Sequence, residues 1–244
     1  MTFHYQFLFL LTASYLGRCY GLKNRLREHP ILRPVVSMIL WWIPFLLIAF
    51  SLSMLGCAAV ITAAYAAWLY GNKKIPQKKN FDASRRRFFF REIFMAAVIL
   101  TVSYFLTVTD HCLIPLPCVQ AFFTTIGVSF ETVLTWISGL ILIDRPANDL
   151  VVHIIRPYAP RQPQSKKMLI ETVTAGRLIG TLERLIMFVL FSIHSVSTIA
   201  FVLTAKSIAR YDRISKDQGF AEYYLLGTLL STGIVILIAS WLLV

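Results

Sequence analysis

The sequence predicts an all-α protein, a polytopic bundle of about six or seven transmembrane helices with one interfacial segment. Hydrophobic residues make up 57% of the chain and charged residues only 15%, whereas charged residues account for about 25% of an ordinary soluble domain. Apolar runs of membrane length recur along the sequence, and basic residues gather between these runs. This distribution is the one that the positive-inside bias gives to membrane proteins.

The chain is strongly basic, with 24 Lys and Arg against 12 Asp and Glu and a formal net charge of +12. Such a charge is typical of nucleic-acid binding or of membrane topology. Because the basic residues lie between apolar runs, we expect the lipid bilayer and its anionic headgroups as partners, and no nucleic acid.

The first apolar run, Phe3 to Leu16, has no basic residue ahead of it, and Arg18 follows it. A cleavable signal peptide has the opposite order, so the run predicts a retained helix. It is shorter than the roughly 20 residues that span a bilayer, so it either spans or lies at the interface. The next run, Val35 to Tyr70, is too long for one span and should fold back near Ser51 to Gly56.

The segment Gly71 to Arg91 is a predicted cytoplasmic loop, held on its side by its charge or gripping anionic lipid. Its basic residues are Lys73, Lys74, Lys78, Lys79, Arg85, Arg86, Arg87 and Arg91. After the predicted span Ile93 to Thr109, a loop without Lys or Arg should face the outside. Its Cys112 and Cys118 form a disulfide or remain two free thiols, and their spacing matches no standard metal site.

The run Val119 to Ile143 is long enough to span and contains Glu131. A carboxylate inside a membrane costs roughly 2.5 kcal/mol or more, so it normally faces a partner or a wet cavity. Glu131 is therefore either a functional group or half of a structural ion pair. Residues 144 to 174 leave the membrane and complete an N-terminal part, 1–174. Asp144, Asp149 and His153 there suit either metal ligation or a solvated interfacial turn.

The C-terminal part, 175–244, combines charges, small residues and membrane-length apolar runs. Gly176 and Gly180 form a G-x-x-x-G pair with Glu183 on the same face, which lets another helix approach closely. Leu185 to Thr204 and Tyr224 to Val244 are the two predicted spans. The candidate functional charged cluster of the whole chain is Glu131, Arg177, Glu183, Arg184, Lys206, Arg210 and Glu222.

If each predicted span crosses the membrane in the direction opposite to the one before it, one segment conflicts with the positive-inside bias. The segment from Lys206 to Glu222 would face outside although it holds four basic residues. Either Leu185 to Thr204 is re-entrant, or Lys206 and Arg210 continue the helix inward and pair with Glu183 or Glu222.

Three strings, Ala175-Gly-Arg-Leu-Ile-Gly-Thr-Leu-Glu-Arg, Thr204-Ala-Lys-Ser-Ile-Ala-Arg-Tyr and Glu222-Tyr-Tyr-Leu-Leu-Gly-Thr-Leu-Leu-Ser, carry a resemblance. They look like the closing signature of a family of bacterial multi-pass membrane proteins of unknown function. The resemblance covers the last quarter of the chain and implies a bacterial inner-membrane location, without any activity. Family members often have a polar residue and a Gly in the helix after the Glu-Arg pair, where this chain has His194-Ser195.

No established catalytic motif fits, so we expect no cofactor or metal, and the balance is against an enzyme. The intramembrane charges favour a channel, transporter or membrane-acting effector. The alternative is a scaffold or assembly subunit, in which the glycine face binds a membrane partner or a second copy of the chain. A third class, an enzyme on a lipid-linked or phosphorylated substrate, would use the arginines to hold phosphate.

Overall fold

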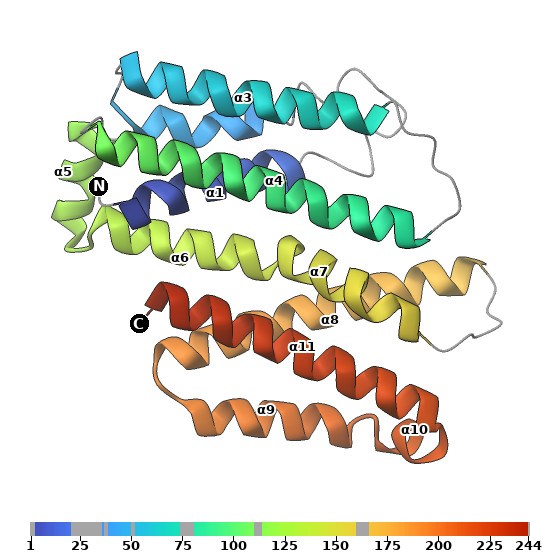
Figure 1. Ribbon diagram of the computed structural model, residues 1–244. Coiled ribbons are helices and arrows are strands. Elements are labelled where there is room, and N and C mark those ends of the chain that lie inside the picture. Colours follow the sequence, from blue (N-terminus) through green and yellow to red (C-terminus); the bar gives the residue numbers. More distant parts are fainter. Residues whose placement is uncertain are drawn as a thin grey trace. The chain divides into compact units, whose positions relative to one another are not determined.

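The computed structural model describes residues 3–20, 36, 39–49, 52–73, 81–109, 114–159 and 166–243 of the chain. The side chains of 17–20, 52–54, 57, 65, 68–73, 81–88, 91 and 166–175 lie outside that description. Throughout the described ranges the regular structure is helical (Figure 1), and the β-type pairing is an isolated bridge between Ile48 and Pro115. The predicted all-α class is confirmed.

The chain forms two compact units, Met1–Ser138 and Gly139–Val244. Their boundary lies inside one helix, α6 (Phe130–Ile143). The division predicted at residues 174 and 175 lies within α8 (Lys166–Ser192), a helix of the second unit, and stays a prediction.

The first unit contains α1 (Phe3–Tyr20), η1 (Ile43–Leu47), α3 (Leu52–Lys73), α4 (Phe81–Val108), α5 (Pro117–Ile126) and the start of α6. The helix α1 packs against α4 and η1, and α3 packs against α4. An aromatic cluster joins α1 to η1: the Phe9 ring meets Phe45 edge-on at 5.3 Å, and Trp41 stacks on Phe45 at 4.9 Å between ring centroids.

Two boundaries in the first unit differ from the predicted ones. The fold-back expected at Ser51 to Gly56 occurs earlier, because α3 already begins at Leu52 and Gly56 lies inside it. The preceding segment ends in η1, where Pro44 occupies the first turn and cannot donate an internal hydrogen bond. The basic segment to Arg91 is also partly helical, since α4 begins at Phe81.

The single span expected over Val119 to Ile143 is wrong in this form, because α5 and the helical segment that starts with α6 are bent by 89°. Gly127, with φ of 77°, ends α5 in a Schellman motif: its N–H reaches the Thr124 carbonyl at 3.1 Å and that of Val128 reaches Phe123 at 3.1 Å. Ser129 then caps α6, accepting the Thr132 N–H at 3.0 Å.

The second unit contains the rest of α6, α7 (Arg145–Ile155), η2 (Arg156–Tyr158), α8, α9 (Val196–Ile208), α10 (Tyr211–Lys216) and α11 (Gln218–Leu243). The helix α11 packs against α7, α8 and α10, and α9 packs on α8. A close helix approach occurs at Gly139, where an added Cβ would overlap the buried Phe188 ring. A glycine at this position therefore lets α6 and α8 meet.

The span expected over Leu185 to Thr204 is also wrong as a single helix. The chain turns at residues 193–195 and α9 runs back along α8 (Figure 1). His194, with φ of 57°, takes the left-handed conformation at the end of α8. Its N–H bonds to the Phe191 carbonyl at 3.0 Å and that of Ser195 bonds to Leu190 at 2.8 Å, a second Schellman motif.

Among the described helices, α11 alone is long and apolar enough to cross a membrane, and the bent pair that begins with α5 meets the same criterion if it is counted as one span. Only 17% of the apolar stretch of α11 is buried inside the protein. This low burial separates α11 from the core helices of soluble proteins, which are mostly buried. It is in itself weak evidence for membrane association, and it leaves the number of spans open.

Candidate functional site

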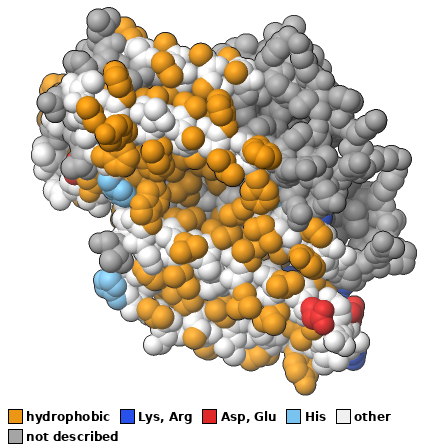
Figure 2. Space-filling model, in the orientation of Figure 1, with side chains coloured by type: hydrophobic (Ala, Val, Ile, Leu, Met, Phe, Trp, Pro, Cys, Tyr) orange, Lys and Arg blue, Asp and Glu red, His pale blue; other side chains and the backbone are white. Residues whose placement is uncertain are grey.

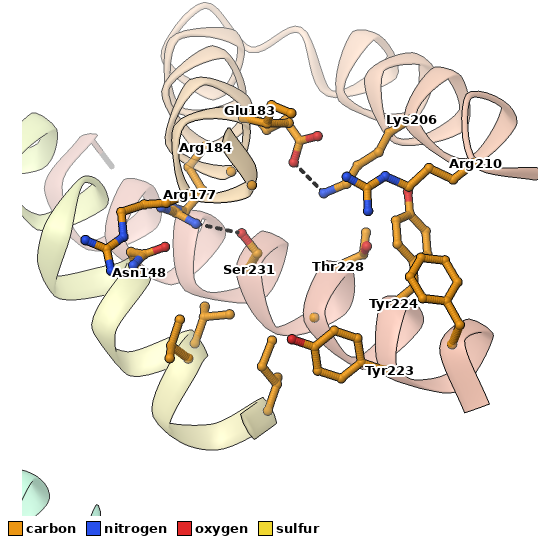
Figure 3. A pocket seen from close by; sticks show the side chains of 18 residues that line it. Asn148, Arg177, Glu183, Arg184, Lys206, Arg210, Tyr223, Tyr224, Thr228 and Ser231 are labelled. Atoms are coloured by element: carbon orange, nitrogen blue, oxygen red, sulfur yellow. Dashed lines mark hydrogen bonds and ion pairs between the residues drawn. The ribbon is translucent and has the colours of Figure 1, made fainter. Parts of the chain in front are cut away.

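A cavity of about 410 Å³ lies within the second unit, between α7, α8 and α11 and the end of α9 (Figure 3). Five members of the predicted charged cluster line it: Arg177, Glu183, Arg184, Lys206 and Arg210. Among the described residues, four cationic side chains and one carboxylate therefore line the cavity. Helices α8 and α9 bring these residues together because the turn at His194 folds one helix back along the other.

Arg184 is the buried cation of this site, with 2% of its surface exposed. Its Nε donates to the Ile143 carbonyl at 2.9 Å, Nη2 to Thr181 Oγ1 at 3.2 Å, and Nη1 to Ser231 Oγ at 3.5 Å. Removing this guanidinium from water carries a cost, and the nearby carboxylates of Asp144 and Glu183 attract its charge and offset that cost only in part.

Glu183 and Lys206 form an ion pair across the turn between α8 and α9, with Lys206 Nζ donating to Glu183 Oε2. Their side chains are 16% and 21% exposed, so water screens the pair only partly. The pair ties the end of α9 to α8 beside the cavity. Figure 3 shows the Glu183 carboxylate and the Lys206 ammonium pointing toward one another.

The remaining cations of the cavity have no carboxylate partner in the described part of the chain. Arg177 is exposed on α8. Arg210 lies over the Tyr224 ring at 5.6 Å from its centroid, and Lys206 lies over the same ring at 5.7 Å. Such cation–π contacts hold the charges in place and leave their N–H groups available for an anion.

Several polar residues that line the cavity lie outside the predicted cluster: Asn148, Tyr223, Tyr224, Thr228 and Ser231. Asn148 and Ser231 are 7% exposed. Tyr223, Tyr224 and Ser231 belong to the string that carries the family resemblance, which was a usable signal. Asn148 offered no such signal, because only the packing of α7 against α8 and α11 brings it to the site.

Gly176 and Gly180 line the cavity, and among the described residues neither lies against the backbone of another helix. An added Cβ at Gly176 would have no neighbour within 4 Å among the described atoms, and one at Gly180 would meet only the Arg184 guanidinium at 3.4 Å. Within this chain the G-x-x-x-G pair therefore makes room for the cavity. Its predicted contact with another chain stays a prediction.

Two predicted cluster members lie elsewhere. Glu222 is exposed and accepts a hydrogen bond from Gln218 Nε2 at 3.1 Å. Glu131 belongs to the first unit and lies in the first turn of α6, where the partial positive charge of a helix N-terminus favours a carboxylate. Because α5 and α6 are separate, Glu131 lies at a helix end instead of within a continuous span.

Asp144, Asp149, His153 and the two cysteines are the remaining candidate residues. Asp144 accepts from Thr181 at 3.3 Å, and the His153 ring bonds to the Asp149 carbonyl at 2.7 Å. Within the described ranges, no group of three or more His, Cys, Asp or Glu is arranged to hold a metal. Cys118 is exposed with a free thiol, and Cys112 lies outside the described residues.

Comparison of the chain with protein-family models, curated proteins and solved structures finds no match in any of the three.

Proposed function

We propose that this chain is a multi-pass integral membrane protein and that its charged cavity carries an anionic solute, as in a channel, a transporter or a membrane-acting effector. The observation that carries the proposal is the charge distribution of the second unit. Large apolar side chains are exposed along α8, α9 and α11, and four of the described cationic side chains of the unit line one cavity.

The apolar character of the outward faces supports the membrane part of the proposal. Leu237 on α11 is 72% exposed, Phe201 on α9 is 71% exposed and Leu178 on α8 is 61% exposed. In Figure 2, hydrophobic side chains spread over much of the visible described surface, and acidic side chains gather at the end where α10 lies. Soluble monomers rarely expose contiguous apolar patches of more than a few hundred Å².

The turn at His194 supports a membrane topology that agrees with the basic residues. If α8 and α9 form a re-entrant hairpin, the segment after Lys206 returns to the side of Arg177. The segment from Lys206 to Glu222 then no longer conflicts with the positive-inside bias, because it lies on the cytoplasmic side together with the basic segment before α8. The resemblance of the C-terminal strings to a bacterial inner-membrane family supports that membrane as the location.

The cavity supports the solute-handling part. Ionisable groups within membrane proteins are costly and generally mark binding sites or conduction paths. Four cations against one carboxylate favour an anion over a cation as the species handled. No cofactor is required by this arrangement, and the balance remains against an enzyme.

Flux through proteoliposomes tests this proposal. The full chain, reconstituted in liposomes, should release chloride or phosphate down its gradient. Lys206→Gln and Arg210→Gln should each lower the rate by about tenfold, the equivalent of one charge-assisted hydrogen bond. Lys216→Gln, the same change on exposed α10 outside the cavity, is the matched control and should keep the wild-type rate. Equal flux in all variants, or none above empty liposomes, would overturn the proposal.

A further inference from the structure

We infer that the cavity of the second unit is a binding site for a phosphate group, held by Arg177, Lys206, Arg210 and Tyr224. This inference rests on the proposed membrane location and solute handling, and it names the chemical class of the ligand. The phosphate belongs either to a phospholipid-type headgroup or to a free phosphate in solution. The chemistry of recognition is the same for both.

The first argument concerns which cations are available. The donors of Arg184 are directed to Ile143, Thr181 and Ser231, whereas Lys206 gives one of its three N–H donors to Glu183 and keeps two for another acceptor. Arg177 and Arg210 have no carboxylate partner in the described ranges, and both residues line the cavity, Arg177 beside Asn148 and Arg210 beside Tyr224 (Figure 3). A guanidinium presents two parallel N–H donors that match two oxygens of a phosphate, and it is always charged.

The second argument is an unpaired hydroxyl. Tyr224 Oη is buried and has no hydrogen-bond partner among the described residues. A buried polar group that is left unpaired costs about 1–3 kcal/mol, so native structures usually supply a partner for it. The Tyr224 ring also lies beneath Lys206 and Arg210. A phosphate oxygen bound by these cations would be the acceptor that the hydroxyl lacks.

The third argument is the apolar part of the cavity lining. Helix α7 contributes the apolar side chains of Val151, Val152 and Ile155, and α11 contributes Phe220, whose ring stacks beside Tyr224 at 6.1 Å between centroids. At about 410 Å³ the cavity has the size of sites that hold whole small molecules, which leaves room beyond a phosphate. A ligand with a phosphate at one end and an apolar part at the other fits this lining, and this favours the headgroup as the source.

Binding to the purified full-length protein in mild detergent tests the inference. The probes are dioleoyl phosphatidic acid, inorganic phosphate and dioleoyl phosphatidylcholine, whose phosphate is shielded by choline. Native mass spectrometry and the midpoint of thermal unfolding give the apparent Kd. We expect phosphatidic acid to bind at least tenfold more tightly than phosphatidylcholine. Binding of inorganic phosphate with equal affinity would assign the site to free phosphate and would also support the inference.

Variants distinguish binding of phosphate in this cavity from non-specific electrostatic attraction of phosphate to a basic protein. Arg177→Gln and Arg210→Gln should each weaken phosphate binding by about tenfold, whereas Lys216→Gln should leave it within twofold. Tyr224→Phe removes the unpaired hydroxyl, so the ligand-free protein should be as stable as the wild type or more stable. The same variant should bind phosphatidic acid about threefold to tenfold more weakly.

Two results would overturn the inference: no binding of any phosphate probe, or equal losses in Lys216→Gln and in the cavity variants. Neither result would remove the proposed function, because flux is measured separately. Flux without phosphate binding leaves the transport proposal standing and ends the phosphate site. Binding without flux supports the phosphate site and ends the transport proposal.

Discussion

Arg184 is the side chain on which the polar interior of the second unit depends. It lies almost fully buried and links α8 to the Ile143 carbonyl at the end of α6 and to Ser231 on α11. A guanidinium in this position keeps three segments together through directional hydrogen bonds. An apolar side chain of similar length would leave the Ile143 carbonyl and the Ser231 hydroxyl without this donor, and would remove the positive charge near Asp144 and Glu183.

We expect Arg184→Met to lower the free energy of unfolding by about 3 kcal/mol, because it removes hydrogen bonds to a charged group and leaves buried acceptors unpaired. Arg184→Lys should have a free energy of unfolding between those of the wild type and Arg184→Met. An ammonium keeps the charge but cannot reproduce the planar pair of donors of a guanidinium. Thermal unfolding in detergent measures the order. Arg177→Gln, an exposed control on the same helix, should change stability by about 0.5 kcal/mol or less. Unfolding of Arg184→Met at the wild-type temperature would contradict this account.

His194 is the second residue with a structural task, because it holds the left-handed conformation that ends α8. This conformation costs a residue with a Cβ about 1–2 kcal/mol, whereas glycine adopts it freely but loses more entropy on folding. We therefore expect His194→Gly to match the wild type within about 0.5 kcal/mol, because the two effects nearly cancel. His194→Ile should lower stability by about 1–2 kcal/mol, since a β-branched residue is a genuine outlier there.

The midpoint of thermal unfolding checks the His194 series, with Ser197→Ile in α9 as the control for adding a β-branched residue close by. If His194→Ile and His194→Gly unfold at the same temperature, the left-handed turn is not what ends α8.

At the scale of elements, the hairpin of α8 and α9 decides which segments lie at the same end of the second unit. Ile155 at the end of α7, Lys206 near the end of α9 and Phe220 at the start of α11 all line one cavity. The chain therefore leaves that end along α8 and comes back to it along α9. If Leu185 to Thr204 were a single helix, it would place Lys206 at the opposite end of the unit, about 30 Å from the cavity, at 1.5 Å per residue over some 20 residues.

This geometry predicts the sidedness of two positions. In a background with the four native cysteines replaced by alanine, Tyr158→Cys in η2 and Ser215→Cys in α10 should react with an impermeant maleimide from the same side of the membrane. Both native side chains are exposed. Right-side-out and inverted vesicles provide the two measurements. Labelling of the two cysteines from opposite sides would mean that Leu185 to Thr204 crosses the bilayer as one helix.

At the scale of the whole molecule, many large apolar side chains of the described residues are exposed, and this exposure makes opposite predictions for water and for lipid. In water, replacing the 72% exposed Leu237 by Glu would be harmless or would improve solubility. In a bilayer the same carboxylate costs roughly 2.5–3.5 kcal/mol. We expect Leu237→Glu to reduce the carbonate-resistant membrane fraction several-fold, with Leu237→Phe unchanged. A gain in soluble, folded protein would contradict the proposed membrane location.

The sequence by itself determined the all-α class and the apolar stretch of α11. Both follow from composition and from the length of apolar runs, which depend on local chain properties and on transfer of side chains from water. It also brought most of the cavity charges into one candidate cluster, because Arg177, Glu183 and Arg184 share α8 and Lys206 and Arg210 lie one helical turn apart.

Only the tertiary structure decided where the apolar runs are interrupted and which residues contact the charged side chains. No break was predicted from the sequence at Gly127 or at His194, and a left-handed histidine in particular depends on the surrounding packing to hold it. Burial of Arg184, the pairing of Lys206 with Glu183 and the arrival of Asn148 on α7 each join residues far apart in sequence. Contacts of that kind arise from the packing of helices against one another, which a pattern along one chain does not encode locally.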